Sequence, residues 1–107
     1  TNWETVPVTE HKGDTGIAYW KTLQFDGLRI RLVDYSPNYL ADHWCEKGHI
    51  IYCLEGEMIT ELADGNKHAL TKGMSYQVSD GLSSHRSSSE NGVKLLIVDG
   101  SCLTNAG

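Results

Sequence analysis

Apolar and polar residues alternate along much of this chain in short runs that predict β-strands. From Leu28 the alternation is regular, with Leu28, Ile30 and Leu32 on one face of an extended segment. Arg29 and Arg31 fall on the opposite face. A period of two residues is the pattern of a strand that has one apolar side.

The phase of this alternation changes at Val33, because Val33 and Tyr35 become the apolar members around Asp34. A β-bulge or a change of frame is the simplest physical account of such a change. Pro37 is expected to end the strand, since proline has no N–H to donate to a neighbouring strand. A solvated outer face is the usual place for the two arginines, whereas an inward face would let them bind the carboxylate of a substrate.

Further runs of this kind recur at short spacing and are separated by turn sequences such as Asp26-Gly27. No segment has the period of an amphipathic helix, so an all-β sandwich or barrel is predicted. With 107 residues the chain has room for one core, and a single domain over 1–107 is expected. An irregular lead-in would occupy residues 1–16, the barrel about 17–99 and a frayed tail 100–107. The other predicted strands are residues 17–23, 49–54, 58–62, 67–70, 75–78 and 93–98, with a turn at 55–57 between two of them.

The strand at 49–54 is apolar on both faces. Ile51 and Cys53 share one side with His49, and Ile50, Tyr52 and Leu54 share the other. Such a strand is expected to be covered twice, by a second sheet on one side and by a further strand layer or another subunit on the other. A homodimer is therefore predicted.

Composition excludes several classes of partner. The formal charge of −5 and the scattered basic residues argue against nucleic acid, and no apolar run approaches the length of a membrane span. Three cysteines are too few for a disulfide framework, so a reducing cytoplasm is expected. Cys53 is interpreted as a small buried apolar residue and Cys102 as incidental. A small molecule remains as the expected ligand or substrate.

Candidate chemistry concentrates between residues 42 and 57, where His43, Cys45 and His49 lie within seven residues. Imidazole and thiolate groups at this spacing are typical of a transition-metal site. His11 and His68 are expected to be surface residues.

These residues resemble the cupin superfamily of small jelly-roll barrels, whose first motif reads Gly-x5-His-x-His-x3–4-Glu-x6-Gly. His43, Cys45, His49 and Gly56 follow its spacing. Pro37 stands in place of the first glycine, Cys45 in place of the second histidine and His49 in place of the glutamate.

The second cupin motif, Gly-x5-Pro-x-Gly-x2-His-x3-Asn, is matched less closely. Gly73, residues 79–81 and His85 follow it with Ser79 in place of proline, with one extra residue before His85, and with Ser89 at the position of the asparagine. The string Ala-Asp-His-Trp-Cys-Glu-Lys-Gly-His is similar to bacterial single-domain cupins named for an Asp-His-Cys-Trp motif.

The resemblance implies an all-β, single-domain cupin jelly-roll barrel in which His43, Cys45, His49 and His85 meet as metal ligands. A set of three imidazoles and one thiolate favours one divalent zinc ion, with iron, nickel or copper as alternatives, and counts against manganese. Cys45 either binds the metal or only lines the pocket. The alternative interpretation makes these residues hydrogen-bonded or buried barrel residues without a metal.

Two functions remain open for a metal-binding cupin. One is a metal-dependent enzyme, an oxygenase or isomerase acting on a small organic molecule, and the other is a non-catalytic sensor or carrier. A structural dimer without metal is a third interpretation. Asp42 and Glu46 flank the predicted ligands, where either could hydrogen-bond an imidazole and fix its tautomer, and solvent exposure is the more usual place for Glu46. Four aromatic residues could line a substrate pocket, although aromatic residues on barrel strands more often belong to the core: Tyr39, Trp44, Tyr52 and Tyr76.

Overall fold

The structure, a computed structural model, describes residues 1–41, 49–78 and 85–100. Those residues form nine strands and one short 3-10 helix, and they contain no helix long and apolar enough to cross a membrane. The elements are η1 (Trp3–Thr5), β1 (Val8–Lys12), β2 (Ile17–Phe25), β3 (Leu28–Tyr35), β4 (Tyr39–Leu40), β5 (His49–Leu62), β6 (Lys67–Thr71), β7 (Ser75–Val78), β8 (His85–Ser89) and β9 (Val93–Asp99).

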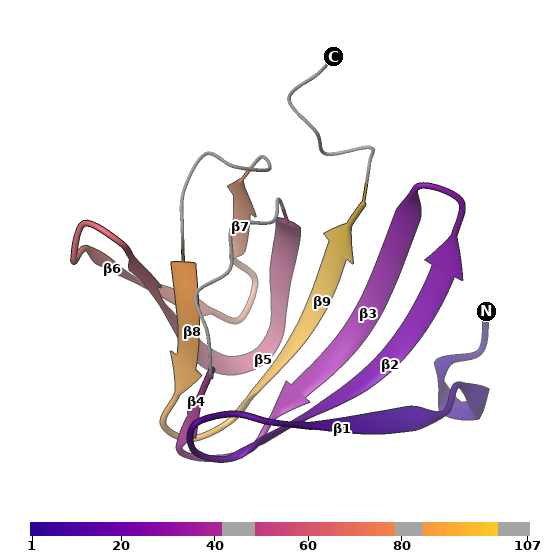
Figure 1. The fold of residues 1–107 in the computed structure, drawn as a ribbon, viewed down its shortest axis with the longest axis horizontal. Helices are drawn as coiled ribbons and strands as arrows, with labels where there is room; N and C mark the ends of the chain where they lie inside the picture. Colours follow the sequence, from indigo (N-terminus) through magenta and orange to yellow (C-terminus); the bar gives the residue numbers. More distant parts are fainter. Residues whose placement is uncertain (42–48, 79–84, 101–107) are drawn as a thin grey trace.

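The strands form one strongly curled antiparallel sheet, in the order β1-β2-β3-β9-β5-β8-β4, with β6 and β7 also paired to β5. Figure 1 shows the sheet folding back on itself, so that β8 and β4 face β3 and β2 across the interior. Strand β9 pairs with β3 on one side and β5 on the other. This arrangement confirms the predicted all-β jelly-roll barrel.

Strand β5 belongs to both walls of the barrel because it bends in its middle. Its register against β9 shifts between Cys53 and Glu55, and Gly56 has a φ of 85°. Glycine adopts this left-handed conformation without strain, which allows a bulged strand to turn sharply. The turn predicted at residues 55–57 is therefore wrong: the chain bends there within one continuous strand.

Neither of the two accounts of the phase change at Val33, a bulge or a change of frame, is correct. Strand β3 keeps one register against β2 and β9 from end to end. Arg31 and Val33 are both buried, with 5% and 2% of their surface exposed, so the face that carries the arginines is the inner one. The apolar residues Leu28, Ile30 and Leu32 lie on the outer face and are only half-buried. The expectation that Arg29 and Arg31 lie on a solvated outer face is therefore wrong.

The core lies between the two walls. Strand β9 contributes every second residue to it, and its buried positions alternate along the whole strand. Cys53 is fully buried, as predicted, and burial raises the pKa of its thiol. The core residues are Val33, Ile51, Cys53, Met58, Leu70, Val93, Leu95 and Ile97, with Trp20, Tyr35 and Tyr76 packed against them.

The first residues are more regular than the sequence indicates. Strand β1 pairs along its length with β2, so the irregular lead-in predicted for residues 1–16 contains a strand. His11 was expected at the surface, but it is half-buried and its ring stacks on Trp20 with centroids 3.7 Å apart. His68, in contrast, is exposed on β6, as predicted.

Candidate functional site

His85 is the first residue of β8 and is buried, with 3% of its surface exposed. Its backbone pairs with Leu62 at the end of β5. Its ring lies 6.0 Å from the ring of Tyr76 on β7, centroid to centroid, at an angle of 60°. A buried imidazole among strands is a suitable ligand for a metal, provided that other donors reach the same space.

His49 is the first residue of β5, and its backbone pairs with Val78 at the end of β7. Two residues further along β5, Ile51 pairs with Tyr76, whose ring approaches His85. Strands β5 and β8 both start at the end of the barrel where β9 finishes (Figure 1). The backbone therefore brings the two strand starts that carry His49 and His85 to one end of the molecule.

Other members of the predicted site lie outside the described residues. These are His43 and Cys45, the flanking Asp42, Trp44 and Glu46, and also Cys102. Among residues 1–41, 49–78 and 85–100, no group of three His, Cys, Asp or Glu side chains is placed to hold a metal ion. The four-residue ligand set remains a prediction.

The three tyrosines that were predicted to line a pocket lie in three different environments. Tyr39 is buried and stacks on Tyr35, with ring centroids 4.1 Å apart. Tyr76 lines a groove of about 550 Å³ between β6 and β7, together with Thr60, whose buried hydroxyl makes no hydrogen bond. Tyr52 is 41% exposed on the outer face of β5 and so does not line the interior.

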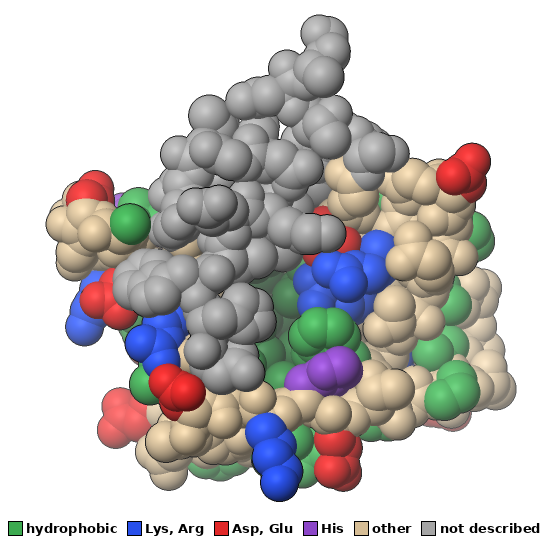
Figure 2. Space-filling view, in the orientation of Figure 1, with side chains coloured by type: hydrophobic (Ala, Val, Ile, Leu, Met, Phe, Trp, Pro, Cys, Tyr) green, Lys and Arg blue, Asp and Glu red, His purple; other side chains and the backbone are tan. Residues whose placement is uncertain are grey.

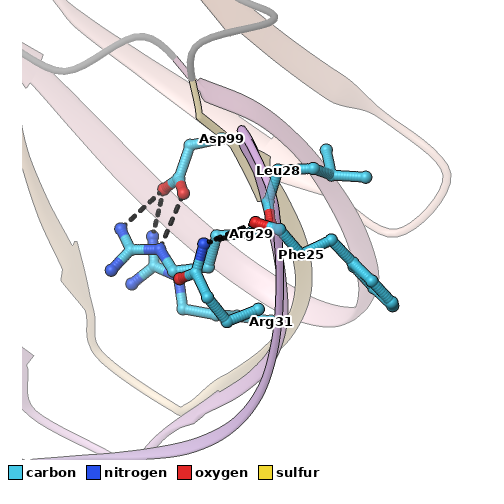
Figure 3. Close-up of polar contacts among 6 residues, drawn as sticks. Phe25, Leu28, Arg29, Arg31 and Asp99 are labelled. Atoms are coloured by element: carbon cyan, nitrogen blue, oxygen red, sulfur yellow. Dashed lines mark hydrogen bonds and ion pairs between the residues drawn. The ribbon is translucent and has the colours of Figure 1, made fainter.

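A cluster of charged side chains lies at the same end of the barrel as the starts of β5 and β8. Arg29 Nε and Nη2 donate to the two carboxylate oxygens of Asp99, at 2.7 and 2.9 Å. Arg31 Nη2 donates to Asp99 Oδ2 at 2.8 Å. Figure 3 shows both guanidinium groups converging on this one carboxylate, which belongs to the last residue of β9.

Arg31 lies over the ring of Trp20. Its guanidinium carbon lies 4.4 Å from the centroid of the Trp20 ring, which also stacks on His11. Figure 2 shows blue, green and purple side chains grouped around the hollow in this face of the molecule. Burial and the adjacent charge of Arg29 lower the pKa of Arg31, and the attraction of Asp99 offsets only part of this.

The sequence analysis singled out neither Asp99 nor Trp20. A signal for Asp99 does exist in the sequence, because a carboxylate closes the otherwise apolar run that forms β9. Its pairing with Arg29 depends on the register between β9 and β3, which places the two residues directly opposite each other. That register joins residues 70 positions apart.

No protein-family model matches the chain, and no curated protein sequence matches it. Solved structures do match. The polyketide cyclase RemF from Streptomyces resistomycificus superposes with a TM-score of 0.79 and 21% identity, over 94% of this chain and 78% of that one. A cupin-like protein from Thermotoga maritima gives 0.75 and 16%, over 87% and 77%. The iron(II) form of HppE, solved with an alternative substrate, gives 0.75 and 16%, over 92% and 58%.

These three proteins share an architecture with the chain at low sequence identity. The agreement extends over most of this chain. It establishes the fold of the molecule and leaves its chemistry to the residues described above.

Proposed function

We propose that this chain, which has the fold of the cupin superfamily, is a small metal-binding cupin of the Asp-His-Cys-Trp type. In this proposal His43, His49 and His85 hold one divalent transition metal ion inside the barrel. Cys45 serves as a fourth ligand or as a group that tunes the metal. The observation that carries the proposal is the burial of His85 at the start of β8, at the end of the barrel where β5 begins with His49.

The donor set fits a borderline or soft cation. Histidine and cysteine are the ligands of structural and catalytic zinc sites, while iron(II), nickel and copper also accept imidazole. Zinc is therefore the favoured ion. If three histidines hold the metal and Cys45 does not, coordination positions stay open for water and a substrate.

The activity that fits such a site best is an oxygenase or isomerase reaction on a small organic molecule. The bound metal would polarise a substrate oxygen or activate a bound reactant. His85 would fix its position from a buried strand end. Proteins with this fold include a polyketide cyclase and the iron(II) protein HppE, which supports an enzyme with a small-molecule substrate.

The proposal includes the partners and the location expected from the sequence. A homodimer is favoured by the exposed apolar side chains of β5, because Ile50, Tyr52 and Leu54 are 41%, 41% and 39% exposed. A cytoplasmic location is favoured by the sparse cysteines, of which Cys53 is a buried free thiol.

Elemental analysis of protein purified without a metal-affinity tag tests the proposal. The parent protein is expected to contain close to one equivalent of a transition metal, and His85→Ala to contain several-fold less, because one buried imidazole is removed. His68→Ala is the matched control, since His68 is exposed on β6, and it should keep the parent's metal. Metal far below one equivalent in the parent, with no change in His85→Ala, would refute the proposal.

A further inference from the structure

The groove of about 550 Å³ between β6 and β7 results from the bend in β5. The two strands follow each other along the chain, but β7 pairs with residues 49–52 of β5 and β6 with residues 57–61. Because β5 bends between these two parts, β6 and β7 run apart from the turn that joins them (Figure 1). The volume that remains between them lies within the range of small-molecule sites, which is roughly 300–1,000 Å³.

Thr60 contributes to this groove a polar atom that the protein leaves unpaired. It lies opposite His68 in the register of β5 and β6, and it is only 2% exposed. Its hydroxyl oxygen is buried and has no hydrogen-bond partner within the described chain. A buried polar group without a partner is normally rare, because it destabilises the folded protein. Valine would have nearly the same shape without this cost, so the hydroxyl calls for a partner that enters the groove.

Apolar side chains make up much of the remaining lining. Leu70 is buried in the core, and Tyr76 packs against that core and is half-buried. Met74 is 47% exposed, and the hydroxyl of Thr71 donates to its sulfur at 3.0 Å. A thioether sulfur makes favourable contacts with aromatic rings. The groove therefore offers apolar surface and a sulfur atom to the ring of an aromatic ligand.

The charges of the groove restrict the ligand further. The described residues that line it include Lys67 and His68 but neither aspartate nor glutamate, which counts against a cationic ligand. Burial raises the pKa of the Tyr76 phenol, so this group stays protonated and neutral at neutral pH. The hydroxyl of Thr60 is neutral as well, and a charged group beside it would be costly to bury. A neutral ligand oxygen is therefore the partner that suits Thr60.

We propose that the groove between β6 and β7 binds a small neutral aromatic molecule that carries a hydroxyl group. The ligand hydroxyl forms a hydrogen bond with Thr60, and its ring packs against Leu70 and Met74. A hydroxyl group can both donate and accept, so one such ligand satisfies the Thr60 oxygen in either direction. The inference goes beyond the proposed function, because this binding requires no metal ion.

Titration with phenol and with toluene, followed by NMR of protein labelled with ¹³C at the methionine methyl groups, tests the inference. The chain has two methionines: Met74 lines the groove, and Met58 is fully buried in the core. Phenol is expected to shift the signal of Met74 in a saturable manner and that of Met58 much less. Toluene carries a methyl group in place of the hydroxyl, so phenol should bind about three- to tenfold more tightly.

Variants of Thr60 separate recognition from a structural role. Thr60→Val should remove the preference for phenol, and Thr60→Ser, which keeps a hydroxyl, should retain it. Thr22→Val is the matched control, because it makes the same exchange at an exposed position on β2 and should leave the preference unchanged. Without ligand, the melting temperature of Thr60→Val should equal or exceed that of the parent, since a buried unpaired hydroxyl is removed. An unchanged preference in Thr60→Val would overturn the inference.

A phenol titration in excess EDTA separates the groove from the proposed metal site. The two are near each other, because the rings of Tyr76 and His85 lie 6.0 Å apart. The affinity for phenol should be the same with and without EDTA. Whether or not Thr60→Val folds, three results for the parent would each overturn the inference: no shift of Met74 with phenol, equal affinities for phenol and toluene, or loss of phenol binding by folded protein in EDTA. A metal-free parent that binds phenol as expected would refute the proposed metal function alone.

Discussion

Gly56 shows how one residue sets the geometry of the barrel. Its φ is 85°, and a Cβ added there would lie 2.5 Å from the carbonyl oxygen of Gly92 and 3.0 Å from Val93 Cα. The backbones of β5 and of the turn before β9 can approach this closely only because no side chain intervenes. The close approach of the two backbones therefore requires a glycine at position 56, which is the last glycine of the first cupin motif.

Gly56→Ala is expected to lower the free energy of unfolding by about 3 kcal/mol or more, since it adds a backbone clash to the strain of a left-handed conformation. Gly65→Ala is the control. Gly65 has a similar φ of 91° but nothing within 4 Å of its Cβ position, so only the strain of about 1–2 kcal/mol applies. Urea denaturation of both variants measures the difference, and equal losses would show that the close approach does not matter.

At single residues, sequence reasoning succeeded where the environment was decided locally. Cys53 was predicted to be buried from its place in an apolar run, and it is. His11 was assigned to the surface because its neighbours in sequence are charged, whereas its stacking partner Trp20 comes from the next strand. Arg29 and Arg31 were misplaced for a related reason: their partner Asp99 lies far along the chain.

Strand β3 shows the limit of periodicity at the scale of an element. Its outer face is apolar and its inner face begins with two arginines. The usual assumption that apolar side chains face the interior therefore assigns residues 28–32 to the wrong faces. The apparent change of phase at Val33 is the point where the inner face becomes apolar. The alternation predicted the strand correctly and could not reveal which face is covered.

The outer faces of β5, β9 and β3 form a continuous apolar surface. Register places Tyr52, Leu96 and Leu32 in one row across the three strands, and Ile50, Val98 and Ile30 in the next. Exposed apolar patches of this kind mark interaction sites. The sequence analysis did not predict that the apolar face of β3 points outward. This face widens the apolar surface beyond the strand at 49–54, from which the dimer was predicted.

The parent chain is therefore expected to sediment as a dimer at micromolar concentration. Tyr52→Lys should shift it to the monomer, because a charge would be buried in the centre of an apolar contact. Ala69→Lys adds the same charge at an exposed position on β6 and should remain dimeric. A parent that sediments as a monomer would contradict the assignment of this face.

At the scale of the whole molecule, the curled sheet brings distant segments to one end of a barrel. The structure confirms the predicted fold. The prediction succeeded because short strands, frequent turns and the two motif spacings all indicate the same architecture. The ligand set depends on segments outside the described residues, so His43 and Cys45 remain predictions. Within the described chain, His85 is buried near Tyr76, and the cluster of Arg29, Arg31 and Asp99 lies on the facing wall (Figure 1).

The central claim is that imidazoles from separate strands share one cation. X-ray absorption spectroscopy of the zinc-loaded protein, beside His85→Ala, tests this claim most directly. The parent is predicted to show a nitrogen shell at about 2.0–2.1 Å with the scattering pattern of three imidazoles, and His85→Ala to show one fewer. A parent spectrum without imidazole scattering, or identical spectra for the two proteins, would contradict it.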